Sequence, residues 1–259
     1  MAIVIGTSGW QYASWRGRFY PPEVAQAGWL EHYAERFAVV EVNNTFYRLP
    51  KESTFADWAR RTPDDFVFVC KMSRFFTHLK RLRDPEQPVG LFLERAAPMG
   101  EKLGPVLVQL PPTMKADVQR LDAALAAFPP SVRVAVEFRH DSWFTDDIRG
   151  VLERRGAALC LADRGSRPVT PLWATAPWTY LRFHWGRGRP ESCYGVDALD
   201  HWVERLAQLL GPDPEAFVFF NNDPNGCAVR DAARFGDLAA RAGITTTRVA
   251  TIREAPVGG

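Results

Sequence analysis

The chain has 259 residues, of which 46% are hydrophobic, and its formal net charge is +2. A chain of this length can bury a large apolar core, and a net charge near zero argues against binding nucleic acid through charge alone. No apolar run approaches the roughly 20 residues that a membrane-spanning helix needs, so we expect no contact with membranes.

The four cysteines show no C-x-x-C spacing, and two of them lie inside apolar runs. They are Cys70, Cys160, Cys193 and Cys227. This pattern favours buried free thiols over a disulfide framework or a zinc site. The segment Met1–Gly6 lacks the features of a secretory signal peptide, so the expected compartment is the reducing cytoplasm.

Short apolar runs rich in Val, Ile, Leu and Phe recur along the chain, and most end in polar residues. Runs of this length that are apolar on both faces are typical of parallel strands covered by helices. The sequence therefore predicts eight strands. They are Ile3–Gly6, Val39–Asn43, Phe66–Lys71, Val106–Gln109, Val132–Glu137, Ala158–Ala162, Thr179–Phe183 and Phe217–Asn221.

Several intervening segments begin with a residue that can cap a helix and continue with apolar residues at helical spacing. The predicted capping residues are Ser53, Asp117, Thr145 and Asp197. Glycine favours the left-handed conformation at a helix end, and Gly156 and Gly211 are predicted to end the helices that follow Thr145 and Asp197. The segment after the sixth strand is rich in proline and is not predicted to be helical.

Eight strands alternating with covering segments over about 250 residues indicate a (β/α)8 barrel of the TIM type. We expect one domain over residues 1–259, with the active face at the C-terminal ends of the strands. An open doubly wound sheet is the alternative fold. It normally has a glycine-rich phosphate turn after its first strand, and Gly6–Trp10 lacks that spacing.

Seven of the eight predicted strands end in charged or hydrogen-bonding residues, which predicts a polar site at the barrel mouth. The residues singled out are Glu41, Asn43, Lys71, Gln109, Glu137, Arg139, Asp163, Arg182, His184 and Asn221. Because strand side chains alternate, Glu137 and Arg139 point the same way, as do Arg182 and His184. A network of ion pairs that only closes the barrel top is the architectural alternative.

Aromatic residues lie close to several strand ends and offer stacking surfaces for a ligand. Trp10, Tyr47 and Trp185 are the predicted binding residues of this kind, although ordinary packing at the barrel rim is an equally good explanation. His78 belongs to a long, basic loop after the third strand, and such loops often bind ligands.

The sequence also resembles the YecE-like family, known as domain of unknown function 72, over nearly its whole length. The matching segments are Gly6-Thr7-Ser8-Gly9-Trp10, Glu41-Val42-Asn43-Asn44-Thr45-Phe46-Tyr47, Thr77-His78, Gln109-Leu110-Pro111-Pro112, Glu137-Phe138-Arg139-His140, Tyr180-Leu181-Arg182-Phe183-His184 and Phe220-Asn221-Asn222. Asp231 departs from the family, which often has Asn there. The resemblance implies a single (β/α) barrel and assigns no activity.

The first functional hypothesis is a metal-independent enzyme, such as a hydrolase or a lyase, that acts on a small sugar, phosphorylated or carboxylated metabolite. Glu41, Glu137, Asp163 and His184 are candidate general acids or bases. Lys71 is a candidate base or imine-forming nucleophile. The remaining polar and aromatic residues would bind the substrate, which we expect to be polar or anionic.

Two other hypotheses stay open. Nucleic-acid binding or repair gains from the high arginine content and the loop aromatics, and loses from the low net charge. A non-catalytic ligand-binding barrel is also compatible with every motif. We expect neither a metal nor another cofactor, because only His140 and His184 among the five histidines lie at strand ends. The sequence does not indicate an oligomeric state.

Overall fold

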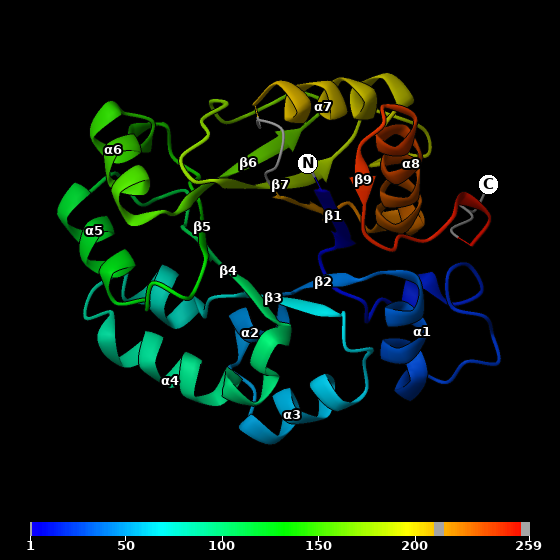
Figure 1. Ribbon diagram of the computed structural model, residues 1–259, viewed down its shortest axis with the longest axis horizontal. Helices are drawn as coiled ribbons and strands as arrows, with labels where there is room; N and C mark the ends of the chain where they lie inside the picture. Colours follow the sequence, from blue (N-terminus) through cyan, green and yellow to red (C-terminus); the bar gives the residue numbers. More distant parts are fainter. Residues whose placement is uncertain (1, 210–214, 255–259) are drawn as a thin grey trace.

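The computed structural model describes residues 2–209 and 215–254 of the chain. Eight parallel strands pair in chain order, β8 pairs with β1, and a contact between β1 and β2 closes the barrel (Figure 1). This closure confirms the predicted barrel and excludes the open sheet. The strands are β1 (Ala2–Thr7), β2 (Val39–Val42), β3 (Val67–Lys71), β4 (Leu103–Gln109), β5 (Val134–Glu137), β6 (Ala158–Arg164), β7 (Trp178–Trp185) and β8 (Glu215–Phe220).

Helices surround the strands in Figure 1. The α-helices are α1 (Trp29–Arg36), α2 (Asn44–Tyr47), α3 (Glu52–Arg60), α4 (Glu86–Ala96), α5 (Val118–Ala126), α6 (Asp146–Arg155), α7 (Val196–Leu209) and α8 (Cys227–Arg241). The short helical turns are Ala13–Trp15, Gln26–Gly28, Phe75–Leu79, Ala97–Lys102, Asp141–Trp143, Pro224–Gly226 and Ile252–Glu254. Within residues 2–209 and 215–254, no helix has the length and apolar character needed to cross a membrane.

Two of the four predicted helix caps are confirmed. The side chain of Asp117 accepts a hydrogen bond from the backbone N–H of Arg120, at the start of α5. Thr145 accepts one from Ile148 at the start of α6, and Gly156 ends that helix in the left-handed conformation. Each cap satisfies a backbone group that the helix end leaves unpaired, which is why these boundaries could be found from sequence.

The other two predicted caps are wrong. Helix α3 begins at Glu52, so Ser53 lies inside its first turn, and the residue before the helix makes no side-chain capping bond. Helix α7 begins at Val196, which places Asp197 within the helix rather than in front of it. An acidic side chain is also favourable in a first helical turn, where it faces the positive end of the helix dipole. Gly211 lies outside the described residues.

The C-terminal part of the chain completes the wall of the barrel between β1 and β2. The two strands touch directly only near their C-terminal ends, where Thr7 pairs with Val40. At the other end β9 (Thr245–Thr246) pairs with β1, and the carbonyl of Arg248 accepts a hydrogen bond from the backbone of Ala38. No apolar run or turn pattern predicts this short ninth strand.

The barrel interior is apolar along most of its length. Its buried side chains are Val4, Val39, Val69, Leu107, Ala135, Ala158, Cys160, Trp178, Tyr180, Phe217 and Phe219. Two residues farther along several of these strands, the inward side chain becomes polar. Because alternate strand residues share a face, Glu41 follows Val39, Lys71 follows Val69 and Glu137 follows Ala135. The strand period therefore gathers charged groups at one end of the barrel.

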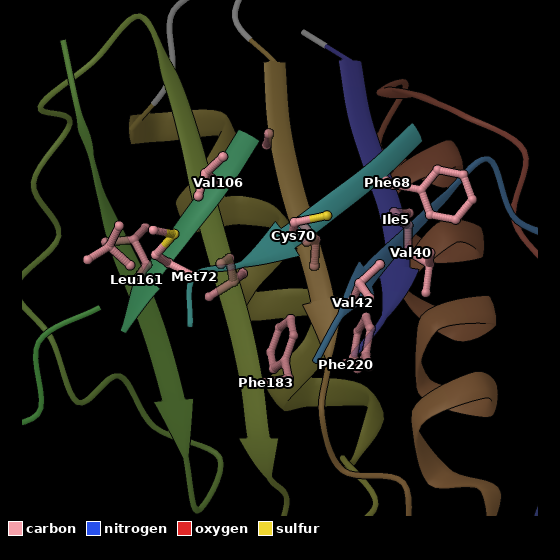
Figure 2. Packing of buried hydrophobic residues seen from close by; sticks show 14 of the residues in the cluster. Ile5, Val40, Val42, Phe68, Cys70, Met72, Val106, Leu161, Phe183 and Phe220 are labelled. Carbon is pink, nitrogen blue, oxygen red and sulfur yellow. The ribbon is translucent and has the colours of Figure 1, made fainter. Parts of the chain in front are cut away.

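A second apolar layer lies between the strands and the surrounding helices. Figure 2 shows a selection of the side chains in this layer. Labelled examples are Ile5, Val40, Val42, Phe68, Cys70, Val106, Leu161, Phe183 and Phe220. Burial on both faces explains why the strands read as nearly continuous apolar runs. Two packed layers hold the strand ends, and with them the polar groups, in fixed positions.

One cysteine expectation is wrong. Cys193, in the loop between β7 and α7, forms a disulfide with Cys227, the first residue of α8. Cys70 and Cys160 are buried and free, as predicted. Disulfides persist mainly in oxidising compartments, so the cysteines no longer support the expectation of a reducing cytoplasm. A separation of 34 residues, with no recurrent spacing, offers no signal for this pairing in the sequence.

Candidate functional site

An arginine holds two glutamates together at the C-terminal end of the barrel. The Nη2 atom of Arg182 lies 2.6 Å from Oε1 of Glu41, and its Nη1 atom lies 2.7 Å from Oε2 of Glu137. Both glutamates are fully buried and Arg182 is 1% exposed. Residues 141 positions apart in the sequence thus meet because β2, β5 and β7 each turn an interior position toward the same end of the barrel.

Glu137 is the most highly coordinated residue of this cluster. Besides its pair with Arg182, it forms an ion pair with Arg139 at 2.6 Å and accepts hydrogen bonds from His184 at 2.9 Å and from Gln109 at 2.8 Å. Burial alone would raise the pKa of Glu137, but the charges of Arg182 and Arg139 and the neighbouring His184 hold it well below its usual range. Glu137 is therefore a fixed anion rather than a proton donor.

Glu41 is held in the same way on the other side of Arg182. The hydroxyl of Tyr180 donates a 2.6 Å hydrogen bond to its Oε2 atom. Burial and the neighbouring carboxylate raise the pKa of Tyr180 well above its ordinary value. Burial would lower the pKa of Arg182, but Glu41 and Glu137 raise it, so the arginine stays charged. Together with Arg139, which pairs with Glu137, the two arginines balance the two glutamates.

Lys71, at the end of β3, differs from the other charged groups of the mouth. It is 8% exposed, and its Nζ atom lies 4.1 Å from the centre of the Phe46 ring. It forms no salt bridge with any acidic side chain in residues 2–209 and 215–254. Burial, followed by the positive charge of Arg182, lowers the pKa of Lys71 to about 8, against the opposing influence of Glu41 and Glu137. A primary amine is therefore partly neutral near physiological pH.

A pocket of about 430 Å³ opens above these groups, and we refer to it as the mouth pocket. Its walls come from the ends of β2, β3, β4, β5, β7 and β8 and from the loop after β1. The lining residues are Ser8, Gly9, Trp10, Gln11, Tyr12, Asn43, Asn44, Tyr47, Lys71, Gln109, Arg139, Arg182 and Asn221. A pocket of this size suits a small molecule, and its walls are mainly polar.

Most of the predicted site residues meet at this pocket or directly behind it. Eight of them line it: Trp10, Asn43, Tyr47, Lys71, Gln109, Arg139, Arg182 and Asn221. Glu41, Glu137 and His184 do not line the pocket, but Glu41 and Glu137 bind Arg182, and His184 binds Glu137. Burial lowers the pKa of His184 despite the adjacent carboxylate of Glu137, so its ring is neutral near pH 7.

Asp163 does not join the cluster, contrary to the sequence-based expectation. Its carboxylate accepts a 2.7 Å hydrogen bond from the indole N–H of Trp202 on α7. It is fully buried in the layer between strands and helices, and burial raises its pKa. Ala158 and Cys160 face the barrel interior, so strand alternation turns Asp163 to the opposite side.

His78 and Trp185 also lie away from the walls of the mouth pocket. His78 contacts the hydroxyl of Thr77 at 2.9 Å and packs edge-on against the ring of Phe46. Trp185 is 41% exposed, and its backbone N–H donates to the hydroxyl of Tyr194. The ring of Phe46 lies between His78 and Lys71 and contacts both. No comparable contact connects Trp185 to a residue of the pocket among the described contacts.

Five lining residues were missed by the sequence-based site prediction: Ser8, Gly9, Gln11, Tyr12 and Asn44. Four of them follow β1 directly, and β1 was the one strand that contributed no polar end to the predicted site. The turn Gly6–Trp10 carried the signal, because a polar turn after a strand faces the barrel mouth wherever it occurs. Asn44 directly follows Asn43, and its side chain donates a 3.0 Å hydrogen bond to Gln11.

The described residues contain no group of three or more His, Cys, Asp and Glu side chains placed to hold a metal ion. The two carboxylates nearest the pocket are already bound to arginine. A divalent cation would have to displace Arg182 to reach either of them. The groups available to a ligand are accordingly an amine, side-chain amides, tyrosines and the outer edge of Arg139.

Comparison with solved structures gives the same barrel. A DUF72 family protein from Thermotoga maritima MSB8 is 28% identical, with a TM-score of 0.80 over 93% of this chain and 100% of its own. A second DUF72 family protein, from Enterococcus faecalis V583, is 20% identical, with a TM-score of 0.76 over 92% of this chain and 95% of its own. The second likeness concerns the fold alone.

Two curated relatives carry names of the same kind. UPF0759 protein YunF of Bacillus subtilis is 25% identical over an alignment of 270 positions, covering 91% of this chain and 94% of its own. UPF0759 protein YecE of Escherichia coli K12 is 34% identical over 146 aligned residues, about half of each chain. The family model described as protein of unknown function DUF72 matches residues 4–254. The chain therefore belongs to the DUF72 family.

Proposed function

We propose that this protein is a metal-independent enzyme that uses Lys71 for proton transfer on a small polar substrate carrying a carboxylate or a phosphate. The observation that carries the proposal is the position of Lys71. It is a buried amine on the pocket wall, without a carboxylate partner among the described residues and with a pKa of about 8. Groups with such shifts inside a pocket are often catalytic.

The other charged groups of the mouth are poorly suited to move protons. Glu137 stays ionised because Arg182, His184 and Arg139 lie against it. Arg182 stays protonated because it pairs with two carboxylates. Their role in the proposal is to position Arg139 and Gln109 at the pocket wall. Lys71 is left as the group whose protonation changes near neutral pH, which is what a general acid or base requires.

The charges around the pocket favour an anionic substrate. Glu41 and Glu137 are balanced by Arg182 and Arg139, so the protonated form of Lys71 leaves a net charge of +1. A substrate carboxylate or phosphate beside Lys71 would complete the neutralisation. Chemistry without a metal is supported by the donors present, since both nearby carboxylates are already bound to arginine.

The neutral form of Lys71 is also a nucleophile. At pH 7 a group with a pKa of 8 is neutral in about a tenth of the molecules, far more than an ordinary lysine. That fraction is enough for either base catalysis or an imine with a carbonyl substrate. Both versions of the proposal depend on the same amine.

Pyridoxal 5′-phosphate is a suitable probe, because it carries an aldehyde and a phosphate on one small molecule. The chain has five lysines, which are Lys51, Lys71, Lys80, Lys102 and Lys115. After brief exposure at pH 8 and reduction with borohydride, peptide mass spectrometry measures the labelling of each lysine. We expect Lys71 to be labelled fastest, and inorganic phosphate to slow its labelling selectively.

The matched control is the exposed Lys115. Lys71→Met should abolish the rapid, phosphate-sensitive labelling, whereas Lys115→Met should leave it unchanged. If Lys71 reacts no faster than Lys115, or if phosphate protects neither residue, the proposal is wrong. Circular dichroism of both variants checks that the fold is retained.

A further inference from the structure

Three amide side chains of the mouth pocket have their donor groups committed to the protein. The Nδ2 atom of Asn43 donates a 3.1 Å hydrogen bond to the backbone carbonyl of Ser8. The Nε2 atom of Gln109 donates a 2.8 Å bond to the carboxylate of Glu137. A carbonyl and a carboxylate only accept hydrogen bonds, so neither amide can be turned over without facing oxygen against oxygen.

The third amide, Asn221, is oriented through a chain of two contacts. Glu137 faces Nε2 of His184 at 2.9 Å, and Asn221 faces Nδ1 of the same ring at 3.2 Å. In a neutral ring the nitrogen beside the carboxylate carries the proton, so Nδ1 accepts and the Asn221 amide must donate. Arg139 also lies 3.2 Å from Nε2 and forms an ion pair with Glu137 at 2.6 Å; an Nε2 that carries the proton cannot accept from Arg139, whereas the carboxylate can accept from Nε2.

Each of these amides is left with its carbonyl oxygen free for another partner. In the part of the chain that the structure describes, the oxygen of Asn43 is buried and accepts no hydrogen bond. No described residue donates to the side-chain oxygens of Gln109 or Asn221, and all three residues line the mouth pocket. The pocket thus presents several fixed acceptors, which an aliphatic ligand would leave unpaired at a cost in affinity.

The pocket combines the amine of Lys71 with amide oxygens that accept hydrogen bonds. A matching ligand therefore carries both an anionic group and hydroxyl groups. We propose that the ligand is a polyhydroxylated anion, namely a sugar acid or a sugar phosphate, whose hydroxyls donate to Gln109 and Asn221. Its anionic group lies against Lys71, an assignment that rests on the proposed function. Tyr12 and Tyr47, which also line the pocket, offer ring surfaces to the carbon–hydrogen faces of such a molecule.

The arrangement also separates this ligand class from simpler anions. A fatty acid or an alkyl phosphate satisfies Lys71 but leaves the side-chain oxygens of Gln109 and Asn221 without donors. Sites built to hydrogen-bond a hydroxyl discriminate strongly against an analogue that lacks it, because their own polar groups are then left unpaired. Hydroxylation should therefore increase affinity, although hydroxyls are better solvated than methylene groups in water.

The test uses calorimetric titration of the whole protein with matched pairs of compounds. One set contains aldonic acids and aldose phosphates of four to six carbons, and the other contains straight-chain carboxylates and alkyl phosphates of the same lengths. We expect at least one hydroxylated compound to bind ten times more tightly than its unhydroxylated counterpart. Comparison of acids with phosphates identifies which anionic group the pocket prefers.

Variants then assign the gain to the amides. Gln109→Met and Asn221→Leu should each weaken binding of the hydroxylated compound about tenfold, while binding of the alkyl counterpart changes less than twofold. The alkyl compound thereby reports whether the pocket has stayed intact.

The outcomes separate the two proposals. If the alkyl compounds bind as tightly as the hydroxylated ones and Lys71→Met abolishes both, the ligand class is wrong and the role of Lys71 stands. If a sugar acid or phosphate binds equally well to Lys71→Met, the role of Lys71 in binding is wrong and the amide acceptors stand. Failure of every compound in both sets to bind overturns the ligand class, and the labelling of Lys71 then decides the proposed function alone.

Discussion

The two sides of the barrel mouth differ in whether a buried positive charge is paired with carboxylates. On one side Arg182 lies between Glu41 and Glu137, and all three are almost completely buried. On the other side the amine of Lys71 is nearly as buried, lies against the ring of Phe46 and forms no salt bridge within the described residues. Together with Arg139, the first side is a closed electrostatic unit whose charges are balanced within the protein. The second carries a desolvated group that is unfavourable for folding and available to a ligand.

This contrast combines two interpretations that the sequence left open. An ion-pair network does close the barrel top, as the architectural alternative states. It involves only part of the polar cluster, however, because Lys71 and the amide oxygens take no part in it. Substitutions on each side of the mouth test the contrast, beginning with the largest expected effect.

Removal of the shared arginine should be the most damaging change. Arg182→Met leaves two buried carboxylates without their cation, and breaking a buried pair typically costs about 3–5 kcal/mol. We expect a loss of that size in the free energy of unfolding at pH 7, measured by urea denaturation. Arg60→Met is the control, because its pair with Asp57 is exposed and should be worth less than about 1 kcal/mol. Equal losses in both variants would contradict the closed-unit interpretation.

A buried carboxylate outside the mouth sharpens the comparison with Glu137. Asp231 is fully buried and accepts hydrogen bonds from the backbone of Tyr194 and from Asn222, and burial raises its pKa to about 6. A raised folded-state pKa means that stability is present below the unfolded value near 3.8 and is lost as pH rises to 6.

Substitution of Asp231 should remove that pH dependence. Asp231→Asn retains an oxygen that can accept both hydrogen bonds but cannot ionise. Its unfolding free energy relative to the unsubstituted protein should therefore increase by roughly 2–3 kcal/mol between about pH 4 and pH 7.5. A pH-independent difference in unfolding free energy between the two proteins would show that burial does not raise the pKa of Asp231. Urea midpoints at four pH values are sufficient.

Removal of the positive charge of Lys71 should increase the free energy of unfolding, whereas removal of the charge of Arg182 should decrease it. The pKa of Lys71 is lowered from the ordinary value of 10.5 to about 8, so the charged amine disfavours folding below pH 8. This unfavourable contribution disappears as pH rises through 8 toward 10.5. Lys71→Met should stabilise the protein by about 1–3 kcal/mol at pH 7 and by less at pH 10. Destabilisation at pH 7 would contradict the account of the open side.

The smallest effects are expected at Asp163. Its carboxylate lies between strand and helix and binds Trp202, so it does not touch the mouth pocket. At pH 3, where the carboxyl of Asp163 is protonated, Asp163→Asn should change the unfolding free energy by less than about 1 kcal/mol, because the amide oxygen can still accept from Trp202. Labelling of Lys71 by pyridoxal 5′-phosphate should be unchanged. A marked loss of Lys71 labelling would show that Asp163 contributes to the site.

Much of the architecture follows from periodicity in the sequence. Apolar runs predicted all eight strands of the barrel, and strand alternation predicted that Glu41, Glu137 and Arg182 share the interior. The same rule, applied from Cys160, turns Asp163 outward. Asp163 lies outside the mouth pocket because parity along the strand, and not the polar character of a strand end, decides which layer a side chain enters.

Other features depend on contacts that no local pattern encodes. Cys193 and Cys227 are joined only because the loop after β7 passes the start of α8. The shifted pKa of Lys71 depends on Arg182 and on burial, both of which are consequences of the folded barrel. Likewise, the orientation of the Asn221 amide depends on His184 and through it on Glu137.

The central claim is that Lys71 is a desolvated amine, and its pKa measures this most directly. Selective ¹³C labelling of lysine Cε atoms gives one NMR signal for each of the five lysines, and Lys71→Met identifies the signal of interest. Titration from pH 6 to pH 12 should give a midpoint near 8 for Lys71. A midpoint near the ordinary lysine value of about 10.4 would contradict the account.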